Sequence, residues 1–380
     1  LLIYSPTSFI LNVGNKLKKP MNTKCKLCKV NDLEDVGSHI FTESIIRTAL
    51  NEDGFTKRAD KELMFEISVN KVGLDFFGSA IQPEKIQEIT GKPVTEEQIA
   101  GNENELINKK LVCRECENKF NPIETAFAQE IYSKIVKKSN SDLKKDTCNY
   151  IAFEDKKLIA LQFVIINVWR ASASNYDNWK LTDDQEEYLR SFILKTVYDD
   201  LDSIIKRTQE FENEISDFDF ALNYFIQDGE HLSDNGVLID NSVNPYFILL
   251  NRLSIVFDFK KINNEEIPEF LTTIIEDNIA CIISSQQENE LRIGINSDEQ
   301  RKLLFNRIAR HQMHQIIKKC NDTFYELHRK FLGFYPPQSS TAYYVKTMQN
   351  YVTERKGKID IQEMLNIIIQ VVSDCGRSYL

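Results

Sequence analysis

The strongest constraint in this sequence comes from two pairs of cysteines with the same internal spacing. Cys25 and Cys28 form the first pair, and Cys113 and Cys116 form the second. Four thiolates in two Cys-x-x-Cys pairs are a common ligand set for tetrahedral zinc. We therefore predict one structural Zn²⁺ site that joins two distant segments of the chain. Because four thiolates leave zinc no open position, this ion is expected to hold the fold together and not to react.

The remaining cysteines, the charges and the apolar runs indicate the compartment. Cys148, Cys281, Cys320 and Cys375 follow no spacing pattern, and disulfide frameworks belong to much shorter secreted chains. No apolar run approaches the roughly 20 residues of a membrane span. In residues 1–20 the lysines follow the apolar part, the reverse of a secretory signal. We expect a cytoplasmic protein with no membrane segment, and we treat residues 1–20 as an upstream or disordered segment.

Turn residues and charge runs divide the rest of the chain. The stretch from Lys134 to Lys145 holds five lysines and one acid around a Ser-Asn-Ser centre, which is typical of a linker. We predict a zinc domain over residues 21–140, in which residues 51–110 form an insertion. Residues 141–380 are expected to form a mostly helical domain with a small β-sheet. The predicted fold class is therefore α+β.

Hydrophobic periodicity and capping residues predict the individual elements. In the zinc domain we expect a short strand at 36–41, a helix after Thr42, and a strand at 63–69. Asn121-Pro122-Ile123-Glu124 is typical of a helix start, and this helix should run to about Lys138. Further on, helices are expected at 158–171, 182–200, 202–214, 297–331 and 359–372, and strands at 221–226, 236–239, 247–259 and 280–283.

The order of motifs around the cysteines resembles that of a known enzyme family. Ser38-His39-Ile40 follows the first cysteine pair, and Leu111-Val112 precedes the second pair, which is followed by Glu117. This order is similar to the HNH endonucleases of the ββα-metal fold, and closest to a bacterial branch with Ser-His-Ile after the first pair. The resemblance covers about residues 21–135.

The resemblance implies phosphodiester cleavage that depends on a catalytic Mg²⁺ or Mn²⁺ ion. His39 would take a proton from water as general base, and Glu117 would bind the hard cation. Ser38 stands where the family usually has an acidic or histidine ligand, and Glu117 stands where it has Asn. Glu124 would support the site if the helix starts early enough to place it on one face with Glu117; otherwise it is the capping acid of Asn121. Asn118 or Asn121 could stand in for the third family histidine.

The distribution of charged residues along the chain bears on whether this protein binds nucleic acid. The net charge of −10 does not favour nucleic-acid binding, so a local basic surface would have to provide it. Residues 301–330 hold eight Lys and Arg residues and two acids, on what reads as an amphipathic helix. The phosphate contacts proposed there are Arg307, Arg310, Lys318 and Lys319; the alternative is a solvated helix face. We assign Trp169 and Arg170, in a strongly apolar helix, to core packing.

Two hypotheses follow from the sequence. The preferred one is an HNH-type endonuclease acting on DNA, with RNA as an alternative substrate. Its C-terminal domain would select the target or bind a protein partner or signal, as in bacterial restriction and phage-defence effectors. The other is a non-catalytic zinc-knuckle module that binds nucleic acid or a protein. Ser38 in place of an acid favours the second hypothesis, whereas His39 and Glu117 favour the first.

Overall fold

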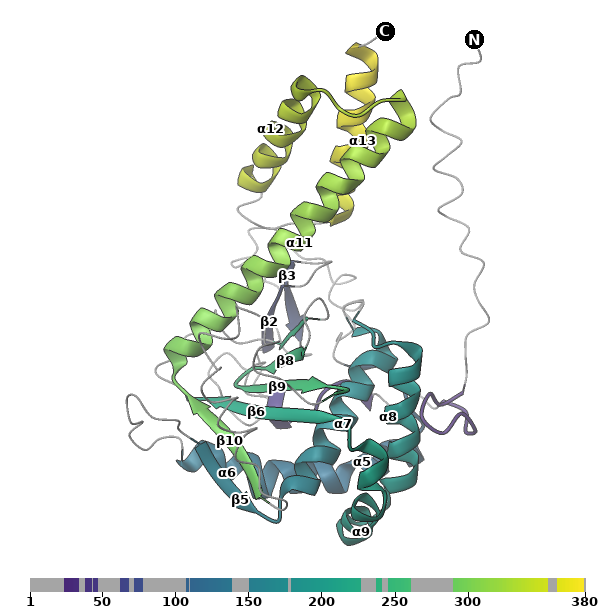
Figure 1. The fold of residues 1–380 in the computed structure, drawn as a ribbon, viewed down its shortest axis with the longest axis vertical. Coiled ribbons are helices and arrows are strands. Elements are labelled where there is room, and N and C mark those ends of the chain that lie inside the picture. Colours follow the sequence, from purple (N-terminus) through teal and green to yellow (C-terminus); the bar gives the residue numbers. More distant parts are fainter. Residues whose placement is uncertain are drawn as a thin grey trace.

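The computed structural model describes thirteen segments of the chain and has a mixed α+β fold (Figure 1). The described residues are 24–33, 38–42, 44–46, 62–67, 72–77, 107–108, 110–138, 150–176, 179–226, 237–240, 245–260, 290–354 and 361–378. The strand expected at 280–283, Cys148, Cys281 and most of the insertion at 51–110 lie outside them. Within the insertion, β2 (Glu62–Ile67) pairs with β3 (Val72–Phe77) as an antiparallel hairpin.

A six-stranded sheet forms the centre of the larger lobe. Its strand order is β5-β10-β6-β9-β8-β7, and only β10 and β6 are parallel neighbours. The strands are β5 (Tyr150–Glu154), β6 (Asp219–Phe225), β7 (Val237–Asp240), β8 (Tyr246–Leu250), β9 (Leu253–Asp258) and β10 (Glu290–Asn296). The sequence pattern predicted β6 and β7, and the single strand expected at 247–259 is divided by a turn at residues 251–252 into β8 and β9. The pattern missed β5 and β10, which are the strands that join distant parts of the chain by pairing with each other.

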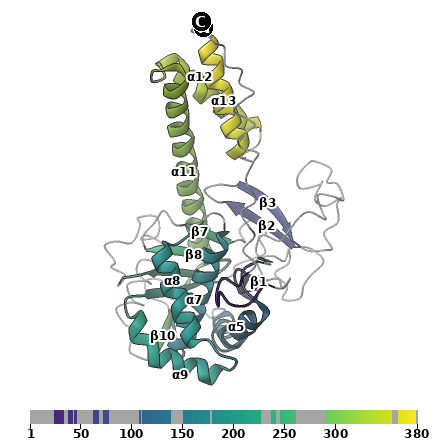
Figure 2. The ribbon, with the colours of Figure 1, turned by 90° about the vertical axis from the view of Figure 1, so that its right-hand side faces the viewer.

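Helix α7 (Lys157–Ser174) is the central helix of this lobe, and it is buried along almost its whole length. Its apolar residues leave no polar face, which is the pattern of a helix covered on all sides. Asn175 ends it in the left-handed conformation, with φ of 55°. α8 (Asp183–Thr196) follows, with the expected Thr182–Gln185 capping box, and α9 (Leu201–Phe211) comes next. Figure 2 shows α7 and α8 on one side of the sheet, with α5 beside them.

The helix after the second cysteine pair begins earlier than we predicted. α5 (Arg114–Ala126) starts directly after Cys113, so Pro122 lies inside the helix and Asn121 is not its N-cap. A proline at this position removes a hydrogen bond to the carbonyl of Asn118. Asn118 is exposed, so water can satisfy that carbonyl. The helix continues through a π-helical turn (Phe127–Tyr132) and α6 (Ser133–Lys138), and ends where we expected.

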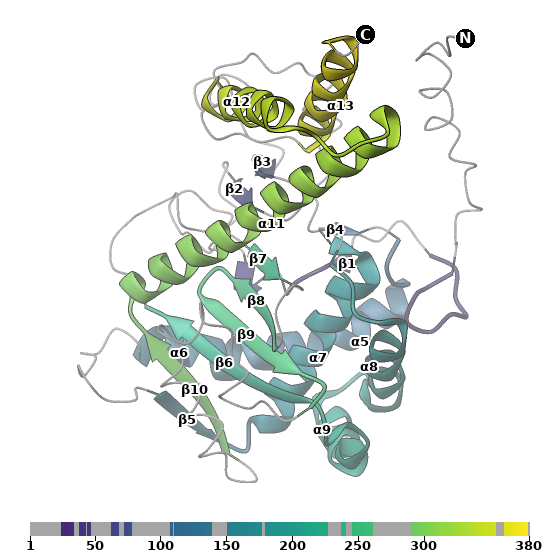
Figure 3. The ribbon, with the colours of Figure 1, turned by 45° about the horizontal axis from the view of Figure 1, so that its top comes forward.

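Three C-terminal helices form an arm with a separate core. α11 (Asp298–Leu332) starts at the expected Ser297–Gln300 capping box and leads away from the sheet directly after β10 (Figure 3). It ends at Gly333, with φ of 85°, close to the end that we predicted at residue 331. α12 (Gln338–Glu354), which we did not predict, and α13 (Ile361–Ser378) pack on its distal half.

The hydrophobic cores run across the boundary that we placed at residue 140. One continuous core contains the cysteines, α5, α7 and one face of the six-stranded sheet, from Cys25 to Ile295. The second core lies within the arm, from Ile316 to Cys375. Residues on both sides of the boundary therefore share one apolar interior, although the division into folding units stays a prediction.

The left-handed turn at Gly333 gives a test of how the arm is built. Gly333→Ala adds a Cβ that meets no heavy atom within 4 Å, so its cost comes from the backbone conformation alone. We expect a loss of about 1 kcal/mol in the free energy of unfolding, measured by urea denaturation. Gln349→Ala, at an exposed position of α12, should change it by less than about 0.5 kcal/mol. If Gly333→Ala and Gln349→Ala lowered the free energy of unfolding by the same amount, this explanation would be contradicted.

Candidate metal centre

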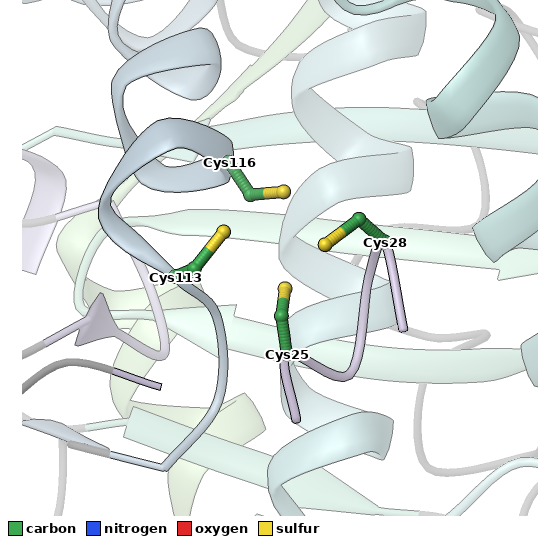
Figure 4. Close-up of side chains that lie close together, drawn as sticks. All are labelled: Cys25, Cys28, Cys113 and Cys116. Atoms are coloured by element: carbon green, nitrogen blue, oxygen red, sulfur yellow. The ribbon is translucent and has the colours of Figure 1, made fainter. Parts of the chain in front are cut away.

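The two cysteine pairs meet in space, as the spacing predicted. Cys25 and Cys28 lie on a tight loop, Cys113 is the N-cap of α5, and Cys116 lies in the first turn of that helix. The four sulfur atoms all lie within 4.8 Å of one another. Figure 4 shows the four side chains pointing toward a common centre. Among the described residues, this is the single group of three or more His, Cys, Asp or Glu side chains placed to hold a metal ion.

The geometry fits zinc. A tetrahedral ion with Zn–S bonds of about 2.3 Å requires sulfur atoms about 3.8 Å apart, within the observed limit. Asn31 lies against the cluster: its backbone N–H donates to the sulfur of Cys28 at 3.5 Å, and its side-chain amide donates to Cys113 at 3.6 Å. Donors of this kind stabilise thiolates and orient metal ligands. The site is thus compatible with a structural zinc ion held by four cysteines.

The thiols of Cys25 and Cys116 share a hydrogen bond. A hydrogen bond from the Cys116 thiol lowers the pKa of Cys25 to about 4, against the opposing effect of burial. The same hydrogen bond, together with burial, raises the pKa of Cys116, and burial raises the pKa of Cys113. A metal ion would bind these residues as thiolates, so its binding would be coupled to the loss of the thiol protons.

The loop of the first pair is fixed by the elements around it. The backbone N–H of Lys26 donates to the carbonyl of Leu111 at 2.9 Å, which joins the loop to the approach of the second pair. Arg190 of α8 donates to the carbonyl of Leu27 at 2.6 Å. The ammonium of Lys26 donates to the carbonyl of Ala173 at the end of α7. The cysteines are consequently attached to the central helices as well as to each other.

The strand that carries His39 lies beside α5. β1 (Ser38–His39) pairs antiparallel with β4 (Ile107–Asn108). Successive side chains of a strand point to opposite faces. Ser38 is completely buried and donates a hydrogen bond to Glu117 Oε2 at 2.7 Å, while His39 is partly exposed. The structure therefore brings Ser38, and not His39, into contact with Glu117, and strand alternation places His39 on the opposite face of β1.

A buried arginine, which sequence reasoning assigned to packing, connects the two glutamates. Arg170 of α7 is completely buried and lies 3.0 Å from Glu117 Oε1 and 2.6 Å from Glu124 Oε1. Its guanidinium also lies over the ring of Phe120, 4.3 Å from the centroid. Because α5 begins at Arg114, Glu117 and Glu124 are two turns apart on one face, the arrangement that we expected for an early start.

The polar network continues beyond Glu124. Thr42 donates from its hydroxyl to Glu124 Oε1 at 2.9 Å, and its backbone N–H donates to Asn167 Oδ1 at 3.0 Å. Asn167 in turn donates to the carbonyl of Phe163 at 2.8 Å. The carbonyl of Thr42 also accepts from the backbone N–H groups of Ile45 and Ile46, at the start of the short helix that we expected after it. Thr42 therefore precedes this helix and bonds to α5 and α7 as well.

Other predicted site residues lie elsewhere. Asn118 is exposed on α5, on a different face from the two glutamates. The predicted phosphate contacts are all on α11: Arg310, Lys318 and Lys319 are exposed, and Arg307 is half-buried. Thr42, Asn167 and Arg170 were missed as site residues. A charged arginine within an apolar helix was the one signal that could have identified Arg170, because buried arginines are rare unless paired.

Comparison of the chain with known protein families, with curated proteins and with solved structures gives no match. Within the part of the chain that the structure describes, no helix combines the length and the apolarity needed to cross a membrane.

The zinc site can be tested by metal content. We expect the purified protein to carry one equivalent of zinc per chain, measured by elemental analysis, and chelation to lower its melting temperature because the four thiolates then lose their common ligand. Cys113→Ser should reduce the zinc content to near zero. Cys320→Ser, at a buried cysteine of the arm, should leave it unchanged. Zinc that survives Cys113→Ser would contradict the assignment.

The role of Arg170 can be tested by stability. Arg170→Met leaves Glu117 and Glu124 with an uncompensated charge in a buried setting, and we expect a loss of about 3–5 kcal/mol in urea unfolding. The control is Arg207→Met, which breaks an exposed pair with Glu210 and should cost no more than about 1 kcal/mol. Adding Glu117→Gln and Glu124→Gln to Arg170→Met should restore part of the loss. No restoration would show that the arginine acts by packing alone.

Proposed function

We propose that this protein is a metal-dependent endonuclease of the HNH type that hydrolyses phosphodiester bonds in DNA, with RNA as an alternative substrate. The observation that carries the proposal is the order of the strands and the helix around the cysteine pairs, together with the positions of His39 and Glu117 on them. A strand pair, β1 and β4, precedes a helix that starts at the second cysteine pair. His39 lies on the first strand, and Glu117 lies one residue after the last cysteine. This order of parts is that of a ββα-metal domain.

In the proposed reaction, His39 accepts a proton from the attacking water. A partly exposed histidine on a strand backed by a buried serine can meet a phosphate and solvent. Glu117 supplies carboxylate oxygens in a position fixed by Ser38 and Arg170, so little reorganisation is needed during the reaction. A Mg²⁺ or Mn²⁺ ion at Glu117 would stabilise the charge that develops on the leaving oxygen.

The polar network sets the charge of the proposed site. Two carboxylates face one guanidinium, so Glu117, Glu124 and Arg170 together carry one net negative charge. This charge suits a divalent cation, and the cation would then offset the charge of a phosphate. Glu124 pairs with Arg170 and accepts a hydrogen bond from Thr42. In this proposal it is a positioning residue, because it holds the guanidinium that contacts Glu117.

The same contacts support a second function. Both oxygens of Glu117 already have partners, one in Ser38 and one in Arg170. In a non-catalytic module these bonds would only stabilise the junction between α5 and α7, and the zinc knuckle would serve to bind nucleic acid or a protein. The C-terminal region would select the target or receive a protein or signal in either case. A role in bacterial phage defence or restriction, in the cytoplasm, is the setting that we propose.

A plasmid-nicking assay separates the two functions. With Mg²⁺ or Mn²⁺, the wild-type protein should convert supercoiled DNA to nicked or linear forms, and His39→Ala should reduce the rate by about 100-fold or more because the general base is lost. The matched control is His314→Ala, at an exposed histidine of α11, which should cleave at the wild-type rate.

Zinc content and melting temperature of both variants should equal those of the wild type, so that a loss of cleavage cannot be attributed to unfolding. Cleavage that persists at the full rate in His39→Ala would remove the nuclease mechanism as proposed. If the wild type binds DNA but does not cleave it with either ion, the non-catalytic function is favoured.

A further inference from the structure

Asn31 contacts both halves of the cysteine cluster. Its backbone carbonyl accepts a hydrogen bond from the N–H of Cys25 at 2.9 Å. Its backbone N–H donates to the sulfur of Cys28 at 3.5 Å. Its side-chain amide donates to the sulfur of Cys113, 82 positions further along the chain, at 3.6 Å. One residue therefore contacts three of the four cysteines and joins the first pair to the second.

The three contacts differ in what they require of the residue at position 31. Any residue except proline could make the two backbone contacts, because they use only the main-chain N–H and carbonyl. The loop that provides them is closed by an antiparallel bridge between Lys24 and Asp32. The contact with Cys113 requires a side-chain donor of suitable length. The identity of the side chain therefore affects this third contact in particular.

A second acceptor orients the Asn31 amide. The same N–H₂ group donates to Glu115 Oε2 at 3.0 Å, and Glu115 Oε1 lies 3.3 Å from Lys119 Nζ. A carboxylate and a metal-bound thiolate are both acceptors, so the nitrogen of the amide, and not its oxygen, has to face them. With one N–H bonded to Glu115, the other is directed at the sulfur of Cys113.

We propose that Asn31 is the positioning residue of the metal centre, and that its side-chain amide holds the Cys113 thiolate in place for a zinc ion. Four thiolates around Zn²⁺ would leave the centre with a net negative charge. A hydrogen-bond donor stabilises that charge without itself binding the ion, and such donors strengthen metal binding. The inference rests on the zinc site and does not depend on the proposed nuclease activity.

Two substitutions distinguish positioning from packing. Asn31→Ala removes the donor, and we expect zinc binding to weaken about tenfold, measured by competition with a coloured chelator. Asn31→Asp keeps the size of the side chain but places a carboxylate against the thiolate and against Glu115, and we expect a loss of about 100-fold. If the side chain only filled space, the order would be reversed, because aspartate has nearly the shape of asparagine.

Cobalt(II) in place of zinc gives a readout that packing alone would not change. A hydrogen bond to a thiolate lowers the energy of the sulfur lone pairs, which are the source of the sulfur-to-cobalt charge-transfer band. The band should therefore move to longer wavelength in Asn31→Ala. The tetrahedral d–d bands should remain, because all four cysteines are still available as ligands.

The matched control is Asp32→Ala, at the next residue of the same loop. The exposed side chain of Asp32 pairs with Lys24 at 3.0 Å. This variant should bind zinc within about twofold of the wild type, because exposed ion pairs contribute little. The melting temperature of each zinc-loaded variant shows whether it folds. If Asn31→Asp does not fold, Asn31→Ala still provides both the affinity and the cobalt spectrum.

Three results would overturn the inference. One is Asn31→Ala with the zinc affinity and the charge-transfer band of the wild type. Another is tighter zinc binding by Asn31→Asp than by Asn31→Ala. The third is a wild-type protein that takes up neither zinc nor cobalt, which would remove the zinc site as well. None of these measurements involves DNA cleavage, so failure of the nuclease proposal would be seen separately.

Discussion

The buried guanidinium of Arg170 is the interaction on which the arrangement around the metal centre depends. It joins α7, the central helix of the main lobe, to two glutamates on α5, the helix that carries two of the four cysteines. A buried arginine is tolerated only where anions compensate its charge, so each partner requires the other. Through Glu117 and Ser38, the same interaction also fixes the strand that bears His39.

The metal centre is part of the main core and not an appendage of it. The cysteine loop hydrogen-bonds to α7 and α8, and Phe127 stacks on Phe163 between the α5 extension and α7, with ring centroids 3.6 Å apart. A single core from Cys25 to Ile295 follows from these contacts. If the cysteines hold zinc, its removal would affect the packing beyond the cysteine loop, whereas the arm of α11, α12 and α13 has an interior of its own.

The buried polar network around Arg170 connects elements from distant parts of the sequence. Two guanidinium nitrogens of Arg170 bond to Glu117 and Glu124, whereas its Nε is buried without a hydrogen-bonding partner in the part of the chain that the structure describes. Buried side chains of the six-stranded sheet, such as Asn223 and Ser254, also lack partners among the described residues. A network in which most groups are matched stabilises one conformation. The network around Arg170 therefore holds α5 and α7 as the frame of the candidate site.

The sequence by itself determined those features whose signal is local. The Cys-x-x-Cys spacing predicted the four cysteines that meet in a group able to hold a metal ion. Capping residues at Thr182 and Ser297 marked the starts of α8 and α11, because such contacts lie within a few residues of each other. Only the tertiary structure decided that α5 begins at Arg114 despite Pro122, and that β5 pairs with β10. It alone placed Arg170 between two glutamates, because ion pairs between residues 46 and 53 positions apart leave no periodic trace in the sequence.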